Sequence, residues 1–364
     1  MPTSLARVLA TRLATQRITS AGLAHGADVV RLLTCVQSQD APLAAWSIGL
    51  RCPPGMSYAA VLAQQSAGGW LRTHILRPTW HLVAPEDLRW IQRLTGPRVE
   101  ASLAGRHRGL GLDDRAIGRA LDTLGDVLCG PTPLTRPELT AQFAARGLPA
   151  SGEQMAHQLI VAELRAVICS GPPRGTTHTY VLAEETVPPN PADTLAGDCA
   201  RRELVRRFVR GHGPVSERDL ARWCTLTLRQ IRPALADLAG QLAHVDVGEH
   251  RLWFDSSAPA RTTRARRAIL LPTFDEAHLT YTATGFPRRV PSAERTRLVS
   301  EAGGGILVLD SEDVGTWKRT LTPTAVRVVL RPDAVLTADA RDAAAQAAQE
   351  LATFVERPLD LTFG

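Results

Sequence analysis

A helix-capping pattern that occurs twice in the chain constrains its fold more than any other feature of the sequence. The segments 133–143 and 214–224 each place Thr or Ser before a helix-like run, an acidic residue three positions further on, and Leu directly after the acid. This is the capping box of a helix N-terminus, in which the hydroxyl and the carboxylate each accept a hydrogen bond from a main-chain N–H group. Both segments therefore predict the first turn of a helix.

The residues after each capping box repeat in the same order. A second amphipathic helix comes next, and two short strands separated by a glycine-containing turn follow it. Helix, turn, helix and a two-stranded wing make up a winged-helix unit. The elements that we expect are helices over 155–166 and 228–238, and strands over 167–170, 179–182, 242–247 and 251–254. Two such units in the same order indicate a repeated architecture.

The segment before these two copies has the pattern of a third, looser one. Its helix-like runs at about 28–36, 41–51 and 57–66 precede a strand-like run at 73–83. A helical segment over 86–126 then leads to the next unit. On this interpretation, the connection between the first two helices of the unit corresponds to the turn of a helix-turn-helix.

The character of the sequence changes beyond residue 255. The elements expected there are a strand over 268–272, a hairpin formed by 306–309 and 314–318, a strand over 321–330 and a closing helix over 338–356. We therefore predict an α+β fold with four domains. They are an N-terminal winged-helix unit with linking helices (1–127), a second unit (128–190), a third unit (191–257) and a C-terminal β-rich domain (258–364).

The basic residues of the chain are almost all arginine. The formal net charge is +6, and Lys318 is the only lysine. Arginine suits bidentate contact with phosphates and base edges, so its excess favours a nucleic-acid partner. A GC-rich genome, which favours arginine codons, explains the same composition. The single lysine argues against Schiff-base catalysis, which needs a positioned amine.

Several other classes of function leave no pattern in the sequence. No apolar run is long enough for a membrane span, and the N-terminus lacks the apolar stretch of a signal peptide, so we expect a cytoplasmic protein. The six cysteines are scattered without a Cys-x-x-Cys pair, which predicts neither a disulfide framework nor a zinc site. Gly-rich phosphate loops and the G-x-S-x-G motif are also absent, and we expect no cofactor and no metal.

The segment 37–40, Gln-Ser-Gln-Asp, lies between two apolar, helix-like runs. Asp40 directly precedes Ala-Pro, so we expect it to cap the next helix, with the proline in the first turn. Gln37 and Gln39 then lie in the connection, where side chains two residues apart point the same way if the chain is extended. The two amides either brace a turn or hold a polar group such as a water, a base edge or a sugar.

Polar side chains also gather at two strand-like segments. His74, Arg77 and His81 lie on or beside one of them. They form either a polar strand face at the edge of the core or contacts to a nucleic-acid backbone and to the glutamine pair. Asp275 and Glu276 follow the second segment. Their position after a strand favours a cap or an arginine partner over a catalytic pair.

Four segments together carry a resemblance to a known family. They are 32–45, which contains Gln37 and Gln39, 73–83 with Thr-His-x-x-Arg-x-Thr-x-His-Leu-Val, 271–276 with Leu-Pro-x-Phe-Asp-Glu, and 315–319 with Gly-Thr-Trp-Lys-Arg. In these motifs the sequence resembles the AlkZ-like tandem winged-helix DNA glycosylases, which include crosslink-unhooking enzymes of Streptomyces type. The resemblance implies three winged-helix units in a C-shaped arrangement with a concave DNA-binding surface, followed by the C-terminal β-rich domain.

The resemblance also implies roles for individual residues. The family uses a Gln-x-Gln motif in catalysis, and a related branch uses Gln-x-Asp, which gives catalytic roles to Gln37 and Gln39. Ser38 stands where the motif of the family is usually apolar. The residues expected to contact DNA or to support the site are Asp40, His74, Arg77, Thr79, His81, Arg264, Arg266, Arg267 and Lys318.

The implied activity is that of a monofunctional DNA glycosylase. It hydrolyses the N-glycosidic bond of N7-alkylated purines and unhooks azinomycin-type interstrand crosslinks, in DNA repair and antibiotic self-resistance. The implied partner is double-stranded DNA that carries alkylated or crosslinked purines, and we expect a monomer that does not associate with membranes. The alternative is a non-enzymatic winged-helix DNA-binding protein such as a transcription regulator, which would release no base from alkylated DNA.

Overall fold

The N-terminal part of the chain combines four helices with a small sheet of strand order β1-β3-β2. The structure is a computed structural model that describes residues 4–175, 177–256, 267–282, 284–287 and 303–364. The helices are α1 (Leu5–Thr15), α2 (Gly26–Leu33), α3 (Ala41–Leu50) and α4 (Tyr58–Ser66), and the strands are β1 (Cys35–Gln37), β2 (Leu71–His74) and β3 (Trp80–Val83). Asp40 caps α3 as expected, since its Oδ1 accepts a hydrogen bond of 3.0 Å from the N–H of Leu43.

The expected helix over 28–36 is wrong at its C-terminal end. Helix α2 ends at Leu33, because Thr34 adopts a positive φ of 65° and turns the chain into β1. The last residue of β1 is Gln37, which pairs with His81 of β3. Gln37 therefore ends a strand and does not lie in a turn between two helices.

The expected single strand over 73–83 is also wrong. This segment forms an antiparallel hairpin of β2 and β3. Leu76 in its connection has a positive φ of 66°, and Pro78 cannot donate a main-chain hydrogen bond to a sheet. The hairpin brings the end of β2 and the start of β3 side by side near Gln37.

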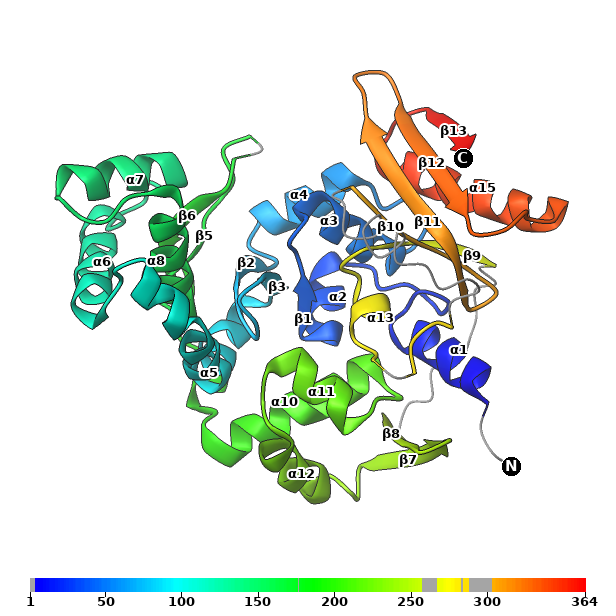
Figure 1. Cartoon of the computed structure of the whole chain (residues 1–364), viewed down its shortest axis with the longest axis horizontal. Helices are drawn as coiled ribbons and strands as arrows, with labels where there is room; N and C mark the ends of the chain where they lie inside the picture. Colours follow the sequence, from blue (N-terminus) through cyan, green and yellow to red (C-terminus); the bar gives the residue numbers. More distant parts are fainter. Residues whose placement is uncertain (1–3, 176, 257–266, 283, 288–302) are drawn as a thin grey trace.

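The middle of the chain forms a separate lobe. The expected helical segment over 86–126 is two helices, because Gly111 takes a positive φ of 68° and Asp113 caps a new helix. The elements are the 3-10 turn η1 (Pro85–Asp87), α5 (Leu88–Gly109), α6 (Asp114–Val127), β4 (Leu134–Thr135), α7 (Arg136–Ala145), α8 (Gly152–Leu164), β5 (Ile168–Ser170) and β6 (Thr179–Leu182). Figure 1 shows α6, α7 and α8 grouped at one end of the molecule, with α5 leading to them.

The second predicted capping box lies within another group of helices, where it begins α11. The elements are α9 (Ala183–Thr186), η2 (Pro191–Thr194), α10 (Gly197–His212), α11 (Glu217–Cys224), α12 (Leu228–Asp237), β7 (Leu242–Val247) and β8 (His250–Asp255). Both predicted capping boxes are confirmed, at Thr135 with Glu138 and at Ser216 with Asp219. Two strands follow the helices in each copy, and β7 pairs with β8 as an antiparallel hairpin.

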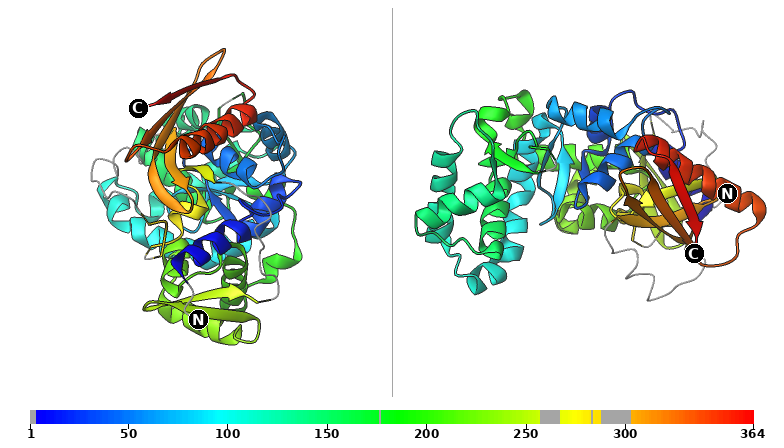
Figure 2. Two further views of the ribbon diagram at one scale, coloured as in Figure 1. Left: turned by 90° about the vertical axis from the view of Figure 1, so that its right-hand side faces the viewer. Right: turned by 90° about the horizontal axis from the view of Figure 1, so that it is seen from above.

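The C-terminal part is a five-stranded sheet of order β13-β12-β11-β10-β9. Its elements are β9 (Ala268–Pro272), α13 (Glu276–Leu279), β10 (Gly304–Leu309), β11 (Glu312–Leu321), β12 (Val326–Pro332), α15 (Ala338–Phe354) and β13 (Leu359–Phe363). The hairpin of β10 and β11 is confirmed. The expected strand over 321–330 begins at 326 instead, and the parallel strand β13 was not expected. Figure 2 shows α15 lying along this sheet.

The N-terminal helices and the C-terminal sheet share one hydrophobic core. Trp46 of α3 packs on Phe354 of α15, with ring centroids 5.1 Å apart, and its Nε1 donates to the carbonyl of Leu270 in β9 at 2.9 Å. These contacts hold β9 and the residues after it against the N-terminal part, which brings Glu276 to Gln37. Within the described residues, no helix has the length and apolar character that crossing a membrane requires.

Candidate active site around Gln37

Gln37 is held at both its main chain and its side chain. It is 8% exposed, its N–H donates to Glu276 Oε1 at 2.9 Å, and its Oε1 accepts from Arg77 Nη2 at 2.6 Å. A guanidinium can only donate, so the carbonyl oxygen of the amide must face Arg77. The amide Nε2 has no hydrogen-bond partner among the described residues. One lone pair of Oε1 and the amide N–H groups are therefore left for a substrate or a water.

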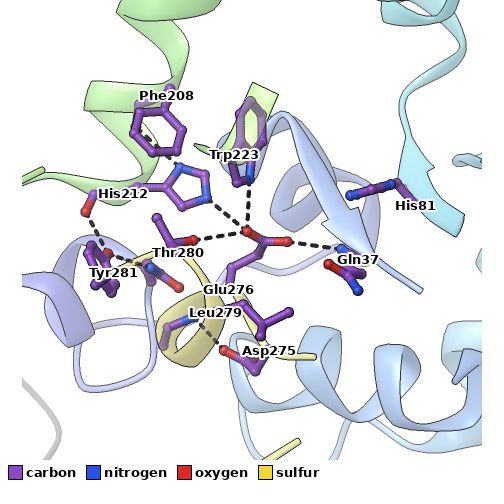
Figure 3. A network of polar contacts seen from close by, with 12 residues as sticks. Gln37, His81, Phe208, His212, Trp223, Asp275, Glu276, Leu279, Thr280 and Tyr281 are labelled. Atoms are coloured by element: carbon purple, nitrogen blue, oxygen red, sulfur yellow. Dashed lines mark hydrogen bonds and ion pairs between the residues drawn. The ribbon is translucent and has the colours of Figure 1, made fainter. Parts of the chain in front are cut away.

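Glu276 is the centre of the network drawn in Figure 3. Its Oε1 accepts from Gln37, and its Oε2 accepts from Trp223 Nε1 at 3.0 Å and from Thr280 Oγ1 at 3.1 Å. His212 Nε2 lies 3.5 Å from the same oxygen. Burial alone would raise the pKa of Glu276, but His212, Arg77 and the N–H of Gln37 lower it to about 2. Glu276 is therefore an anion whose oxygens are all engaged by the protein.

Arg77 joins Gln37 to two other segments. Its Nη2 also contacts His81 Nε2 at 3.1 Å, and its Nη1 donates to the carbonyl of Trp223 at 3.2 Å. His81 Nδ1 donates to the carbonyl of Thr79 at 2.9 Å, which leaves Nε2 as the acceptor for Arg77. Burial and the nearby Arg77 lower the pKa of His81 to about 3. His81 is thus neutral, and its tautomer is set by its two partners.

A second layer of contacts fixes the residues around Glu276. His212 stacks on Phe208 with ring centroids 4.6 Å apart, and its Nδ1 donates to the carbonyl of Phe208 at 3.2 Å. The Nε2 of His212 is therefore directed at Glu276. The hydroxyl of Tyr281 donates to the carbonyl of His212 at 2.6 Å and accepts from Gln16 Nε2 at 2.8 Å. These contacts leave the histidine little freedom to turn away.

Asp275 has the structural role that its position after a strand predicted. It caps α13 by accepting from the N–H of Ala277 at 2.8 Å, and it forms a fully buried ion pair with Arg51 at 2.8 Å. Glu276, its neighbour, has a different role from the one expected. Its partners are Gln37, Trp223, Thr280 and His212 rather than an arginine in direct contact.

Gln39 and Asp40 lie at the exposed end of the motif. Gln39 is exposed, and its Oε1 accepts from the N–H of Trp80 at 3.2 Å. Both glutamines therefore contact the hairpin of β2 and β3, with their carbonyl oxygens turned to the protein and their Nε2 groups unpartnered among the described residues. Ser38 between them is fully buried, and its Oγ accepts from Arg72 Nε at 3.2 Å. This contact explains how a hydroxyl is tolerated at a usually apolar position.

The other predicted site residues that the structure describes make no hydrogen bond to Gln37. His74 contacts Glu163 of α8, the Thr79 hydroxyl is enclosed without a partner, and Arg267 pairs with Asp310 at 3.2 Å on the surface. Lys318 lies on β11, opposite Gly304 and Val329. Arg264 and Arg266 are outside the described residues. The structure thus brings together Gln37, Arg77 and His81 from the predicted set.

The sequence analysis missed three residues that surround Gln37. They are Glu276 as a direct partner, His212 and Trp223. Glu276 lies in one of the four motif segments, and Trp223 lies in the second repeat copy. Neither fact predicts a contact with Gln37, which is far from both residues in the chain. Within the ranges that the structure describes, no group of three His, Cys, Asp or Glu side chains is placed to hold a metal ion.

Comparisons with known proteins agree in pointing to one family. A family model described as DNA glycosylase AlkZ-like matches residues 30–354. An interstrand DNA cross-link repair glycosylase of Streptomyces sahachiroi is 26% identical over 343 residues, which cover 87% of this chain and 88% of that protein. The solved structure of the Streptomyces sahachiroi DNA glycosylase AlkZ has the same fold, with a TM-score of 0.78, 22% identity and 100% of both chains covered. The family match spans most of the chain, and this chain therefore belongs to the AlkZ-like DNA glycosylase family.

Proposed function

We propose that this protein is a monofunctional glycosylase that hydrolyses the N-glycosidic bond of N7-alkylated purines in double-stranded DNA. Its substrates include interstrand crosslinks of the azinomycin type, so that the protein serves DNA repair and antibiotic self-resistance. The observation that carries the proposal is the match of residues 30–354 to the AlkZ-like glycosylase family. The contacts that fix Gln37 between Arg77 and Glu276 support it.

The chemistry of such a substrate suits a site built from amides. Alkylation at N7 makes the purine cationic, so the base leaves as a neutral molecule when the C1′–N9 bond breaks and its electron pair goes to the ring. No strong general acid is needed for this step. The sugar becomes oxocarbenium-like, a water oxygen bonds to C1′, and the water releases its proton to solvent. The protein must therefore stabilise a cation and place a water.

Gln37 and Gln39 are the residues that we assign to these two tasks. A carbonyl oxygen with one lone pair already used by the protein still offers a second lone pair to a water or to positive charge. The amide is too weak a base to take a proton from water, so its role is orientation and electrostatic stabilisation. Arg77 holds the side-chain amide of Gln37, and Glu276 holds its main-chain N–H. Because the two residues carry opposite charges, together they fix Gln37 without adding a net charge to the site.

Glu276 does not act as the base in this proposal. It is 1% exposed, and both its oxygens accept hydrogen bonds from the protein. A carboxylate in this state is a positioning residue. His81 likewise holds Arg77 and has no free ring nitrogen. The reaction thus depends on neutral amides that charged neighbours hold in place, which fits a substrate that brings its own positive charge.

We further propose that the repeated helical units are winged helices arranged in a C-shape around DNA. Two capping-box helices, each followed by a second helix and two strands, support this reading. Arg267, Lys318, Asp40, His74 and Thr79 remain proposed contacts or supports for the DNA, and Arg264 and Arg266 remain proposed on the sequence alone. An open concave surface would accept a bulky crosslink that cannot enter an enclosed pocket.

The test is incubation of the purified protein with two duplexes, one crosslinked by azinomycin and one containing N7-methylguanine. Denaturing gels then show whether strands separate from the crosslink and whether alkali cleaves the methylated strand at abasic sites. We expect both. Binding to DNA without base release from either duplex contradicts the proposal and favours a non-enzymatic DNA-binding protein.

A further inference from the structure

Arg319 on β11 is a buried cation whose guanidinium has no hydrogen-bond partner among the described residues. Arg319 is 8% exposed, and its guanidinium nitrogen Nη1 is buried without a hydrogen bond. Among the described residues its guanidinium makes no hydrogen bond and no ion pair, whereas its main-chain N–H donates to the carbonyl of Gly303. A guanidinium has five N–H donors, and burying them unpaired is unfavourable. A site that keeps such a group is suited to a ligand that completes it.

Two of the described groups, Asp40 and Tyr58, interact electrostatically with Arg319. The carboxylate of Asp40 offsets part of the positive charge of Arg319, but it makes no hydrogen bond to the guanidinium. Asp40 caps α3 and Tyr58 is the first residue of α4, so Arg319 lies near the N-terminal ends of two helices. Helix N-termini carry partial positive charge, which favours an anion. One N–H group of each helix is already capped, by Asp40 in α3 and by Ser57 in α4. Asp40 is the residue directly after Gln39, which places this cluster beside the proposed catalytic segment.

Tyr58 adds a second donor to the cluster. Its hydroxyl has no hydrogen bond among the described residues, while its ring packs edge-on against Phe354 with centroids 6.0 Å apart. Gln39, the residue before Asp40 in the chain, is exposed, and its Nε2 group has no hydrogen-bond partner among the described residues. The groups without partners are thus mainly donors: a guanidinium, a hydroxyl and an amide. A phosphate, with several acceptor oxygens and a negative charge, matches them.

We propose that Arg319 and Tyr58 form a subsite for one backbone phosphate of the DNA next to the lesion. This inference rests on the proposed function, because that function supplies DNA as the ligand. The phosphate accepts from the guanidinium and from the phenol, and it fixes the register of the strand against Gln37 and Gln39. Arg319 is then a DNA-binding residue and not a core residue, although it is as buried as many core residues.

The opposite view, that Arg319 stabilises the fold, makes a different prediction about stability. Removing a charge that is buried and unpaired relieves an unfavourable burial, so the variant should be at least as stable as the wild type. Removing a charge that contributes to the fold should lower the melting temperature. If Arg319 has a structural role, removing its charge lowers both the melting temperature and the DNA affinity. If Arg319 binds DNA, only the affinity falls.

The experiment compares Arg319→Met, Arg319→Lys and Tyr58→Phe with the wild type. The matched control is Arg327→Met, because Arg327 lies on the neighbouring strand β12, is exposed and already pairs with Asp360 at 2.9 Å. For each protein, melting temperature is measured, and the dissociation constant for an undamaged duplex is measured at several salt concentrations. The slope of log affinity against log salt reports the number of phosphates that the protein neutralises.

For Arg319→Met we expect an unchanged or higher melting temperature, an affinity reduced roughly tenfold, and a salt slope smaller by about 1. Arg319→Lys keeps the charge and should restore most of the slope. Tyr58→Phe should weaken binding a few-fold with the slope unchanged, since it removes a donor but no charge. A salt slope for Arg319→Met equal to that of Arg327→Met overturns the inference, whatever happens to the melting temperature. If Arg319→Met does not fold, full affinity of Tyr58→Phe overturns it.

Failure of this inference and failure of the proposed function give different results. Binding is measured on undamaged DNA, so the subsite is tested without any base release. Wild-type excision together with an unaltered salt slope in Arg319→Met rejects only the subsite. Wild-type binding that depends on Arg319 without base release from alkylated DNA rejects only the proposed reaction.

Discussion

Two buried charges, Glu276 and Arg319, have opposite surroundings although both lie at the C-terminal sheet. Glu276 is 1% exposed and accepts hydrogen bonds from Gln37, Trp223 and Thr280, with His212 nearby. Arg319 is 8% exposed and its guanidinium donates to no described residue. The protein itself supplies the hydrogen bonds to the first charge, whereas the second has none from the described residues and is our proposed phosphate contact.

The difference shows how the proposed site divides its work between two kinds of buried charge. A buried charge with all its hydrogen bonds made fixes the groups around it, and Glu276 in this way fixes the main chain of Gln37. A buried charge without partners costs stability in the free protein and is useful only when a ligand arrives. In the proposed site, positioning and binding therefore belong to two different clusters, one around Glu276 and one around Arg319.

The largest effect is expected from Glu276→Gln, which breaks the hydrogen-bond network around Glu276. The amide that replaces the carboxylate brings an N–H group against donors from Gln37, Trp223 or His212, so hydrogen bonds are lost on at least one side. Removal of one partner from a buried charged network typically costs about 3–5 kcal/mol of unfolding free energy. We expect that loss in chemical denaturation, together with a strongly reduced rate of base release under single-turnover conditions.

Asp87→Asn is the matched control for this variant. Asp87 is also a fully buried carboxylate, but its partners are Arg207 and Trp90 and not Gln37. This variant should lose stability and keep the rate of base release of its folded fraction. Equal loss of rate in the two variants contradicts a special role of Glu276 at Gln37.

A smaller effect is expected from Arg77→Met, which frees the side chain of Gln37 and leaves its main chain held. Misplacement of a catalytic group by about 1 Å can cost roughly a hundredfold in rate. We expect a fall of about that size in the single-turnover rate, with little change in DNA affinity. Arg98→Met is the control, because Arg98 donates to the carbonyl of Thr225 and has no contact with Gln37. An unchanged rate in Arg77→Met would show that the amide needs no arginine to hold it.

The smallest effect concerns how the unfolding free energy depends on pH. It separates the neutral His81 from the charged Glu276 within the cluster around Gln37. Burial lowers the pKa of His81 from 6.5 to about 3, so the unfolded chain binds a proton in this window that the folded protein does not. The stability from neutral His81 is present above pH 6.5 and is lost as the pH falls. Between pH 6.5 and pH 5 this loss is about 2 kcal/mol, because one pKa unit corresponds to about 1.4 kcal/mol.

Denaturation of the wild type and of His81→Gln at both pH values checks this expectation. The variant should lose less stability than the wild type on acidification over that range. The contribution of Glu276 has the same sign but a lower window, since its pKa falls from 4.5 to about 2. Its stability is present above pH 4.5 and is lost only below it. A pH profile that is the same for the wild type and for His81→Gln contradicts the assignment of a neutral buried His81.

Local patterns in the sequence predicted the parts of the fold that local interactions determine. The capping boxes at Thr135 and Ser216 and the cap at Asp40 each depend on residues within three positions, so composition and spacing suffice to find them. The motif containing Gln37 and the nearby Arg77 could also be found, because the family resemblance covers both segments.

The remaining features depend on contacts between distant residues or on single main-chain angles. The short strand β1 follows a helix-like run without any change in composition, and a positive φ at Thr34 ends the helix there. Glu276 reaches Gln37 only because Trp46 and its neighbours hold the C-terminal sheet against the N-terminal helices. No pattern in a single sequence encodes which of many buried carboxylates will make such a contact.

The most direct test of the central claim is the single-turnover rate of base release from an N7-methylguanine duplex by the wild type, Gln37→Ala and Gln39→Ala. The duplex affinity of each protein is measured in parallel. If amides held in place by Arg77 and Glu276 perform the reaction, both variants bind the duplex and Gln37→Ala releases base at a small fraction of the wild-type rate, with Gln39→Ala also impaired. Full excision activity in both variants would contradict the catalytic assignment and with it the account of how this site works.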